Sequence, residues 1–378
     1  MKIVSIVGAR PQFVKLAPFA RVIDAHNIAK AEDATIEHII VHSGQHYDAG
    51  MSDVFFDELQ IPKPDYNLQI GSGSHGWQTG RMLEKLDVLL ARLEPDRVMV
   101  YGDTNSTLAG ALAAVKRHYK LIHVEAGLRS FNRHMPEEIN RIVTDHVCDV
   151  LLAPTQTAID NLKAENLAKR TVFTGDVMYD AVLFNSRLAE QRSNVLARMA
   201  LTPGSYGVVT IHRAENTGSS QLRSILDTLS TISAQYFPLV FPVHPRTRAC
   251  LNDQLRDWQV NAQLQLAEPQ GYLDMLQLVA NARIVLTDSG GLQKEAFFLN
   301  CPCITLREET EWVETVIGGG NVVCGTQSDA VIKAVQRWQQ HLSAADQSHS
   351  TLDFSAAAHA SFGDGRSAEI ILAAVLAS

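Results

Sequence analysis

The sequence, 378 residues long, predicts an α/β protein with two doubly wound parallel sheets that face each other across a cleft. Short and almost wholly apolar runs alternate with helix-like stretches, which is typical of parallel strands covered on both faces. This alternation occurs twice, and the chain is too long for one ordinary core. A polar and mostly helical stretch, 174–203, separates the two halves.

The first half contains five apolar, β-branched runs that we expect to be strands. They lie at 2–7, 36–42, 97–101, 121–124 and 150–153. Three helical patterns lie between them, at 13–25, 76–92 and 106–118. Because helices separate the strands, neighbouring strands are expected to run parallel.

The second half repeats this pattern. Its expected strands lie at 207–211, 239–243, 284–287 and 303–306, and its clearest helices at 221–235, 273–281 and 291–298. We therefore expect an N-terminal domain at 1–175 and a second domain at 176–365. A final helix, 366–378, is expected to pack back on the body, with the first domain as one candidate surface.

The composition narrows the class of function. Hydrophobic residues make up 46% and charged residues 20%, the profile of a soluble globular protein. A net charge of −8 without a long basic run argues against nucleic acid as a partner. No apolar stretch approaches the ~20 residues of a membrane span, and the apolar N-terminal run is too short for a signal peptide. We expect a cytoplasmic protein whose five scattered cysteines stay reduced.

Candidate functional residues were sought where strands end, because doubly wound sheets bind ligands beyond the carboxyl ends of their strands. After the first strand, Arg10 and Lys15 place two cations near a helix N-terminus, which favours an anion site. A surface salt-bridge pair is the alternative. The segment 8–15 lacks the three-glycine dinucleotide fingerprint, so no NAD site is expected there.

Three carboxylates, Asp103, Glu125 and Glu137, lie on consecutive loops of the first domain. Strand ends meet at one edge of a parallel sheet, so we expect these groups to converge and to serve as acid–base machinery. The alternatives are local. Asp103 would cap the next helix, and Glu137 with Glu138 would complement a helix dipole.

The second domain carries two histidines and a glycine turn at its strand ends. His212 and His244 each follow a strand beside an arginine, which favours a phosphate site. They lack a companion set of metal ligands, so no metal is expected. Ser289, Gly290 and Gly291 end a strand and open a helix, where bare N–H groups would cradle a diphosphate. Glu295, one turn further, would accept hydrogen bonds from a ribose diol; a simple capped turn is the alternative.

These motifs, in this order, resemble the non-hydrolysing UDP-N-acetylglucosamine 2-epimerase family over nearly the whole chain. The motifs are Gly-Ala-Arg-Pro at 8–11, Gly-Asp-Thr at 102–104, His-Val-Glu-Ala-Gly-Leu-Arg at 123–129, Pro-Glu-Glu at 136–138 and Thr-Asp-Ser-Gly-Gly at 287–291. The resemblance implies two Rossmann-like domains of the glycosyltransferase-B kind and a homodimer. It also implies UDP elimination and re-addition through a 2-acetamidoglucal, with neither NAD nor metal.

The resemblance assigns roles by position. The catalytic set that it implies is Arg10, Lys15, Asp103, Glu125, Glu137 and His212. The set that it implies for UDP is His244, Ser289, Gly290, Gly291 and Glu295, joined by Arg10. The loop 269–272, with Tyr272, resembles the segment that stacks on uracil. The product would serve bacterial surface polysaccharide synthesis, such as that of O-antigen.

Two departures bear on the substrate. Gln45 and His46 are followed by Tyr47 and Asp48, where some members carry a basic residue of an allosteric site. The stretch 129–135 looks more like the branch that epimerises UDP-2,3-diacetamido-2,3-dideoxy-glucuronic acid. A buried uronate needs a cation, which Arg129 or Arg133 would supply. For Arg133 the alternative is exposure to solvent or a pair with Glu138.

Three rival functions share part of this pattern. A glycosyltransferase of the same fold would transfer the sugar to an acceptor and would not need three carboxylates. A hydrolysing 2-epimerase would release free UDP. A binding or regulatory module would bind the nucleotide sugar without turnover.

Overall fold

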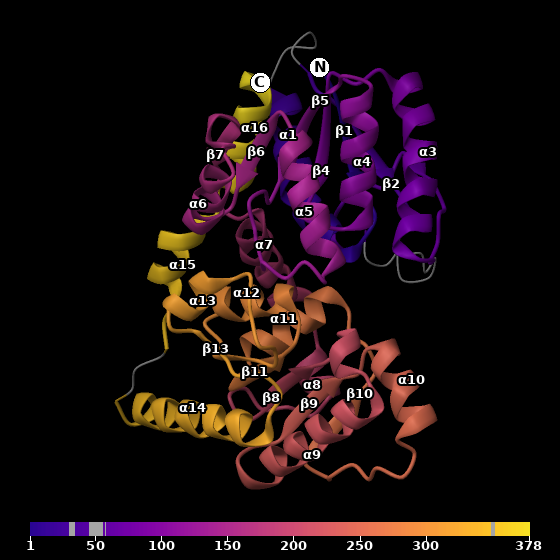
Figure 1. The fold of residues 1–378 in the computed structure, drawn as a ribbon. Helices are drawn as coiled ribbons and strands as arrows, with labels where there is room; N and C mark the ends of the chain where they lie inside the picture. Colours follow the sequence, from indigo (N-terminus) through magenta and orange to yellow (C-terminus); the bar gives the residue numbers. More distant parts are fainter. Residues whose placement is uncertain (30–34, 45–55, 57, 349–351) are drawn as a thin grey trace. The chain divides into compact units, whose positions relative to one another are not determined.

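The computed structural model describes residues 1–29, 35–44, 56, 58–348 and 352–378, without the side chains of 344–348. The chain forms two compact units (Figure 1). Unit 1 comprises Met1–Ala181 and His359–Ser378, and unit 2 comprises Val182–Ala358. Each unit is an α/β layer structure around a parallel sheet, so the predicted class of two α/β domains with parallel sheets is confirmed.

Unit 1 is built on a seven-stranded parallel sheet in the order β3-β2-β1-β4-β5-β6-β7. Its strands are β1 (Lys2–Val7), β2 (Glu37–His42), β3 (Tyr66–Asn67), β4 (Arg97–Tyr101), β5 (Lys120–Val124), β6 (Val150–Ala153) and β7 (Thr171–Phe173). The order reverses at β1, whose Ile6 pairs with Val41 on one side and Val100 on the other. Such a switch point opens a crevice at the carboxyl ends of the strands.

Helices flank this sheet. They are α1 (Arg10–Ala29), α3 (His75–Leu93), α4 (Asn105–Lys116), α5 (Pro136–Val147), α6 (Gln156–Ala164) and α16 (Ser367–Ala377); α7 (Val177–Arg192) begins in unit 1, and α15 (Ser355–Phe362) ends in it. α4 begins with a capping box in which Thr104 accepts from the backbone N–H of Thr107. Thr104 therefore caps α4, and the side chain of Asp103 is not used for that purpose.

Unit 2 is built on a six-stranded parallel sheet in the order β10-β9-β8-β11-β12-β13. Its strands are β8 (Gly207–Thr210), β9 (Leu239–Pro242), β10 (Leu264–Ala267), β11 (Ile284–Thr287), β12 (Cys303–Thr305) and β13 (Asn321–Val323). Its helices include α8 (Val195–Arg198), α9 (Ser219–Gln235), α10 (Pro245–Gln254), α11 (Tyr272–Ala280), α12 (Gly290–Phe298), α13 (Val313–Ile317) and α14 (Ser328–Ser348).

The strands fill the cores of the two units. Ile3, Ile6 and Val98 in unit 1, and Val208 and Val285 in unit 2, are fully buried. Burial of each such side chain contributes roughly 1.5–3 kcal/mol. Strands that are apolar on both faces need helices on both sides, which explains why the expected strand ranges agree with the observed ones to within a residue at either end.

The last helix belongs to unit 1. α16, drawn in yellow in Figure 1, packs against α1. Asp180 of α7 caps it, because its carboxylate accepts from the backbone N–H groups of Ser367 (3.1 Å) and Ala368 (2.8 Å). The side chain of Arg97, on β4, donates to the carbonyl oxygen of Ser378 at 2.8 Å. The predicted division at residues 175 and 365 lies close to these limits and stays a prediction.

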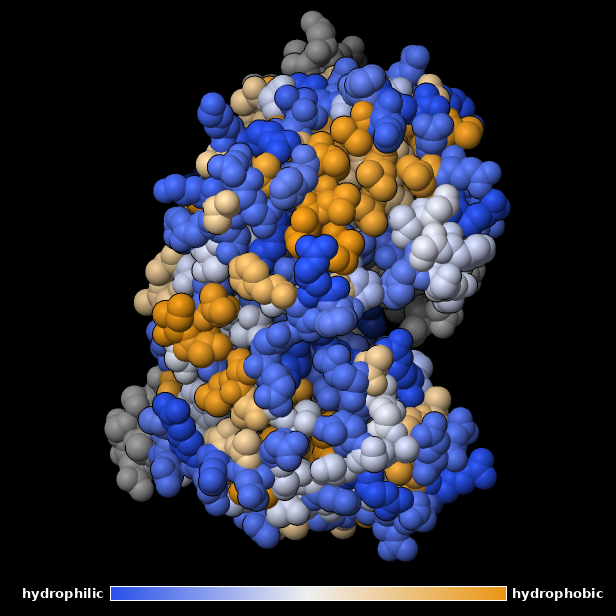
Figure 2. Space-filling view, in the orientation of Figure 1, coloured by the Kyte–Doolittle hydropathy of each residue, from blue (hydrophilic) through white to orange (hydrophobic). Residues whose placement is uncertain are grey.

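Apolar side chains gather on the face of unit 1 where α4 and α5 lie (Figure 2). Six of them, all half-buried, come from these two helices: Leu108, Leu112, Val115, Ile139, Ile142 and Val143. Within the described ranges, no helix is both long and apolar enough to cross a lipid bilayer.

Candidate active site

A buried ion pair lies at the carboxyl ends of the unit 1 strands. Lys15 comes from the second turn of α1 and Glu125 follows β5 directly, and the ammonium group of Lys15 donates to Glu125 Oε2. Their side chains are 10% and 5% exposed. Glu125 has φ of +71°, a left-handed conformation that costs a residue with a side chain about 1–3 kcal/mol. Such strain at a charged, buried position is typical of functional sites.

Two glycines allow the loops to approach this pair. A Cβ at Gly102, where φ is +63°, would lie 3.1 Å from Lys15 Nζ and 3.2 Å from Glu125 Oε2. A Cβ at Gly8 would lie 2.0 Å from Ser43 Oγ, which is too close for any side chain. The backbones of these loops therefore pack against neighbours that leave no room for a larger residue.

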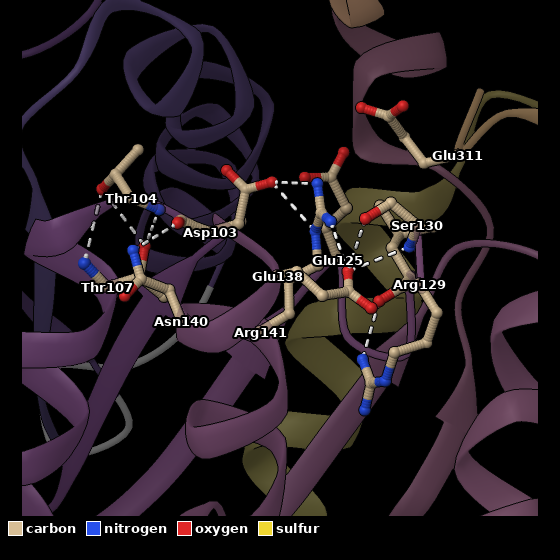
Figure 3. A network of polar contacts seen from close by, with 12 residues as sticks. Asp103, Thr104, Thr107, Glu125, Arg129, Ser130, Glu138, Asn140, Arg141 and Glu311 are labelled. Carbon is tan, nitrogen blue, oxygen red and sulfur yellow. Dashed lines mark hydrogen bonds and ion pairs between the residues drawn. The ribbon is translucent and has the colours of Figure 1, made fainter. Parts of the chain in front are cut away.

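Asp103 follows Gly102 and is held by an arginine. Arg141, on α5, donates to Asp103 Oδ2 from Nη2 at 2.6 Å and from Nε at 3.0 Å. The same guanidinium donates from Nη1 to Glu138 Oε2 at 2.8 Å, so that it bridges the two carboxylates (Figure 3). Asn140 also donates to the carbonyl oxygen of Asp103 at 2.9 Å. Asp103 keeps 29% of its side chain exposed, which leaves it accessible.

Glu138 holds the loop that precedes α5. Its carboxylate accepts from the backbone N–H of Ser130 at 2.9 Å (Figure 3) and from that of Phe131, also at 2.9 Å. Burial raises the pKa of Glu138, but the N–H of Ser130 and the guanidinium of Arg141 outweigh burial and leave this pKa below its ordinary value. Phe131, with φ of +59°, stays 77% exposed. Glu138 therefore does more than complement a helix dipole, and its ion pair is with Arg141 and not with Arg133.

The other predicted residues of unit 1 differ in exposure. Arg10, at the start of α1, is exposed, and Glu137 is half-buried and makes no ion pair with any described residue. Arg129 is buried: it donates to both oxygens of Glu165 at 2.7 Å and lies 2.8 Å from Asp145 Oδ2.

This burial argues against a direct contact between Arg129 and the sugar, because its donors are already used inside unit 1. Arg133 is exposed and makes no ion pair with the described part of the chain. The segment 45–48, where the sequence departs from an allosteric motif, lies outside the described residues.

In unit 2, a buried aspartate organises the first strand end. Asp288, after β11, is fully buried and accepts from the backbone N–H groups of His212 (3.1 Å) and Arg213 (3.0 Å) and from the amide of Asn216 (3.1 Å). His212 Nδ1 lies 3.2 Å from Asp288 Oδ1. Burial raises the pKa of Asp288, but these hydrogen bonds and the nearby His212 outweigh it and lower the pKa. Asp288 thus orients the His212 ring.

The other unit 2 residues lie at neighbouring strand ends. The ring of His244 lies 5.4 Å from that of His212, and His244 caps α10 by accepting from the N–H of Arg246. Ser289 caps α12, which was the alternative to a diphosphate site, with its hydroxyl 3.5 Å from the N–H of Leu292, so that Gly290 and Gly291 begin the helix.

Two further residues of the predicted UDP set are largely buried. Glu295, in α12, is 9% exposed, and Tyr272, which begins α11, is 8% exposed. Among the residues that the structure describes, no group of three or more His, Cys, Asp or Glu side chains is arranged to hold a metal ion.

Several structural partners escaped the sequence reasoning. Gln12 accepts from the N–H groups of Gly8 and Ala9 and donates to the carbonyl oxygen of Tyr101, which joins the loops after β1 and β4. Arg141 and Asp145 of α5 were also missed, although both share a helix face with Glu138 at the spacing of one and two turns. That spacing is the feature of the sequence that could have indicated these two residues.

The fold and the strand-end residues define the class of protein first. Two Rossmann-like α/β units, one with buried acid–base pairs at its strand ends and one with a glycine-opened helix, make this a glycosyltransferase-B-like enzyme. A family model described as UDP-N-acetylglucosamine 2-epimerase matches residues 29–376. The chain belongs to the UDP-N-acetylglucosamine 2-epimerase family and is a UDP-sugar 2-epimerase, an isomerase.

Individual relatives agree with this assignment. A UDP-N-acetylglucosamine 2-epimerase homolog of Methanococcus maripaludis is 48% identical over 345 residues, covering 89% of this chain and 92% of the relative. The UDP-2,3-diacetamido-2,3-dideoxy-D-glucuronate 2-epimerase of Pseudomonas aeruginosa is 48% identical over 340 residues, with the same coverage. The crystal structure of Methanocaldococcus jannaschii UDP-GlcNAc 2-epimerase in complex with UDP-GlcNAc and UDP is 39% identical, with a TM-score of 0.88 over the whole of both chains.

Proposed function

We propose that this enzyme inverts C2 of a UDP-linked 2-acetamido sugar by eliminating UDP and adding it back through a 2-acetamidoglucal intermediate. The observation that carries this proposal is the buried Lys15–Glu125 pair, with Asp103 on the adjacent loop, at the strand ends of unit 1. Epimerisation at C2 without a redox step needs an acid and a base near each other, and this arrangement supplies two carboxylates with different partners.

The bonds balance without an external reagent. A base takes the proton from C2, a C1=C2 double bond forms, and the C1–O bond to UDP breaks with its electron pair leaving on the diphosphate. In the return step an acid protonates C2 on the opposite face, and the diphosphate oxygen bonds to C1 again. UDP must stay bound between the two steps, since it is re-added.

The residues of unit 1 would serve the sugar. Asp103, Glu125 and Glu137 are the candidate base and acids, and their partners differ, since Arg141 holds Asp103 and Lys15 holds Glu125. Carboxylates in different environments differ in proton affinity, which is what a base and an acid on opposite faces of C2 require. Which carboxylate takes which role stays open.

The residues of unit 2 would serve the nucleotide. The backbone N–H groups at the start of α12, at Gly290 and Gly291, favour a diphosphate, and the helix dipole adds to this preference. Ser289, His244 and Arg10 complete the proposed anion set. Glu295 would bind the ribose, Tyr272 with the loop 269–272 the uracil, and His212, oriented by Asp288, the departing diphosphate.

Isotope exchange tests this mechanism. In deuterium oxide, the product of a UDP-2-acetamido sugar should carry deuterium at C2, and ¹⁸O placed in the anomeric bridging position should scramble into the diphosphate. A hydrolysing enzyme would release UDP in stoichiometric amount, and a glycosyltransferase would need an acceptor. Inverted product without solvent deuterium would overturn the proposal.

A second candidate substrate is UDP-2,3-diacetamido-2,3-dideoxy-glucuronic acid. It is supported by the 48% identity to the Pseudomonas aeruginosa enzyme named for that sugar, and by the exposed Arg133 between Glu125 and Glu137. A uronate carboxylate that loses water costs several kcal/mol unless it meets a cation, and a guanidinium offers two parallel hydrogen bonds. Service to surface polysaccharide synthesis, including O-antigen, stays a prediction.

A comparison of kcat/KM on the two UDP-sugars tests this candidate. We expect Arg133→Ala to lose activity selectively on the uronic acid, by roughly 10-fold or more if the arginine pairs with the carboxylate. Arg81→Ala is the matched control, since Arg81 is an exposed arginine of unit 1 paired with Glu84 at 2.7 Å on α3. A parent that prefers UDP-N-acetylglucosamine, with no selective loss in Arg133→Ala, would return the enzyme to the plain branch.

A further inference from the structure

A buried histidine connects the loops that carry Asp103 and Glu125. His123, on β5, is fully buried, and each of its ring nitrogens faces an acceptor. Nδ1 lies 2.7 Å from Asp145 Oδ1, and Nε2 lies 2.7 Å from the carbonyl oxygen of Gly102. Since a carbonyl oxygen only accepts hydrogen bonds, Nε2 must carry a hydrogen.

The neighbours of Asp145 favour its ionised form. Its Oδ2 accepts from the N–H of Gly127 at 3.1 Å and lies 2.8 Å from Nη1 of Arg129. Burial raises the pKa of Asp145, but the hydrogen bond from His123 and the charges of His123 and Arg129 outweigh burial and leave the pKa below its ordinary value. An ionised carboxylate only accepts, so the geometry calls for a hydrogen on Nδ1 of His123 as well as on Nε2.

The two acceptors of His123 lie next to the loops of the candidate carboxylates, so a movement of either acceptor would also move a carboxylate. The backbone of Gly102 packs against the Lys15–Glu125 pair, since a Cβ there would come within 3.2 Å of both charged groups. Gly102 also precedes Asp103 in the chain. On the other side, Asp145 holds the N–H of Gly127, two residues after Glu125. One imidazole thus joins the β4–α4 and β5–α5 loops.

We propose that His123 and Asp145 form a buried imidazolium–carboxylate pair that sets the positions of Asp103 and Glu125 relative to each other. The proposal rests on the proposed function for its effect on turnover, and not for the state of the pair. Neither residue touches substrate in this account, so both are positioning residues. A shift of about 1 Å in the reacting groups can cost 10²-fold in rate, so a pair that positions them can have a large effect on turnover.

Substitutions at His123 test its two hydrogen bonds one at a time. His123→Gln places an amide near the position of Nε2 and keeps the bond to Gly102, whereas His123→Asn places it near Nδ1 and keeps the bond to Asp145. Each should lower kcat by roughly 10- to 100-fold, with KM and the Kd for UDP unchanged, since the proposed UDP set lies mainly in unit 2. Parental kcat in His123→Gln would overturn the proposal.

Asp145 offers a conservative rescue. The amide of Asp145→Asn can donate to an unprotonated Nδ1, while its oxygen still accepts from Gly127, so this variant should keep most of the parental kcat. Asp145→Ala should lose as much as His123→Gln. Equal loss in the asparagine and alanine variants would contradict positioning by hydrogen bonds. His146→Asn, on the exposed side of α5, is the matched control and should leave kcat unchanged.

The state of the ring can be measured without substrate. In ¹⁵N-histidine-labelled full-length protein, both ring nitrogens of His123 should show the signature of a protonated nitrogen, and Asp145→Asn should change Nδ1 alone. An unprotonated ring nitrogen in the parent would overturn the proposal. If the parent gives no C2 exchange on either UDP-sugar, the proposed function fails, while this spectrum still decides the state of the pair.

Discussion

The three candidate carboxylates of unit 1 differ in their partners. Glu125 is buried against the ammonium group of Lys15, Asp103 is half-exposed against the guanidinium of Arg141, and Glu137 makes no ion pair with the described residues. A residue in the left-handed region, as Glu125 is, holds its carboxylate where an extended backbone would not place it. Different surroundings are what a set of carboxylates needs if one is to act as base and another as acid.

Glu125→Gln tests the central carboxylate. Turnover should fall by ~10²-fold or more, because an amide neither takes nor gives the C2 proton. The Kd for UDP should stay at the parental value, measured by calorimetry, because the proposed UDP set lies mainly in unit 2. Near-parental turnover would remove Glu125 from the catalytic set.

Glu37→Gln is the matched control for this prediction. Glu37 also pairs with a lysine of unit 1, Lys2 at 3.7 Å, but its side chain is 62% exposed. Exposed pairs contribute about 0–1 kcal/mol, so stability and turnover should remain those of the parent.

At the scale of elements, α5 organises the site. On this helix, Glu138, Arg141 and Asp145 follow one another at intervals of about one turn and therefore share a face. That face contacts the loop before α5 through Glu138, the loop after β4 through Arg141, and β5 through Asp145. One rigid helix thereby aligns two loops and a strand, which is more precise than loops that support themselves.

A second element, α16, is held by a group that titrates. Burial raises the pKa of Asp180 from 3.8 to about 6, in spite of the N–H groups of Ala368 and Ser367 that lower it. The folded protein therefore binds a proton that the unfolded chain releases between these values. The contribution of protonated Asp180 to the free energy of unfolding is complete below pH 4. It is lost as the pH rises through 6, a change of about 3 kcal/mol.

Asp180→Asn should remove this dependence. Between pH 4 and 6, the unfolding free energy of the parent should fall relative to that of Asp180→Asn. Denaturant titration of both proteins at each pH measures this difference. Asp24→Asn is the control, as Asp24 is an exposed aspartate of α1. Parallel curves for parent and Asp180→Asn would show that Asp180 does not titrate in this range.

At the scale of the whole molecule, the half-buried apolar face of α4 and α5 supports the predicted homodimer. Leu112, Ile139 and Val143 are among its residues, and a contiguous apolar patch of this kind is commonly covered by another protein surface. We expect the parent to be a dimer in light-scattering chromatography, and Leu112→Glu to shift it towards monomer. Ile317→Glu, at an 82% exposed position of unit 2, should stay dimeric.

The nine predicted strands and the two-sheet class depend on local pattern, and the sequence alone determined them. An apolar run of four to six residues between turn signals has few uses other than a buried strand. β3, β7, β10 and β13 were missed, because they are edge strands of only two to four residues.

The tertiary structure alone decided which charges meet. Lys15 and Glu125 are 110 positions apart, Arg129 and Glu165 are 36 apart, and His123 reaches back to Gly102. Arg129, which the sequence predicts to contact the sugar, pairs with Glu165 and Asp145 inside unit 1, and its contact with the sugar stays a prediction. Such pairs follow from the strand order β1-β4-β5, which brings particular loops together, and no local pattern in the chain specifies that order.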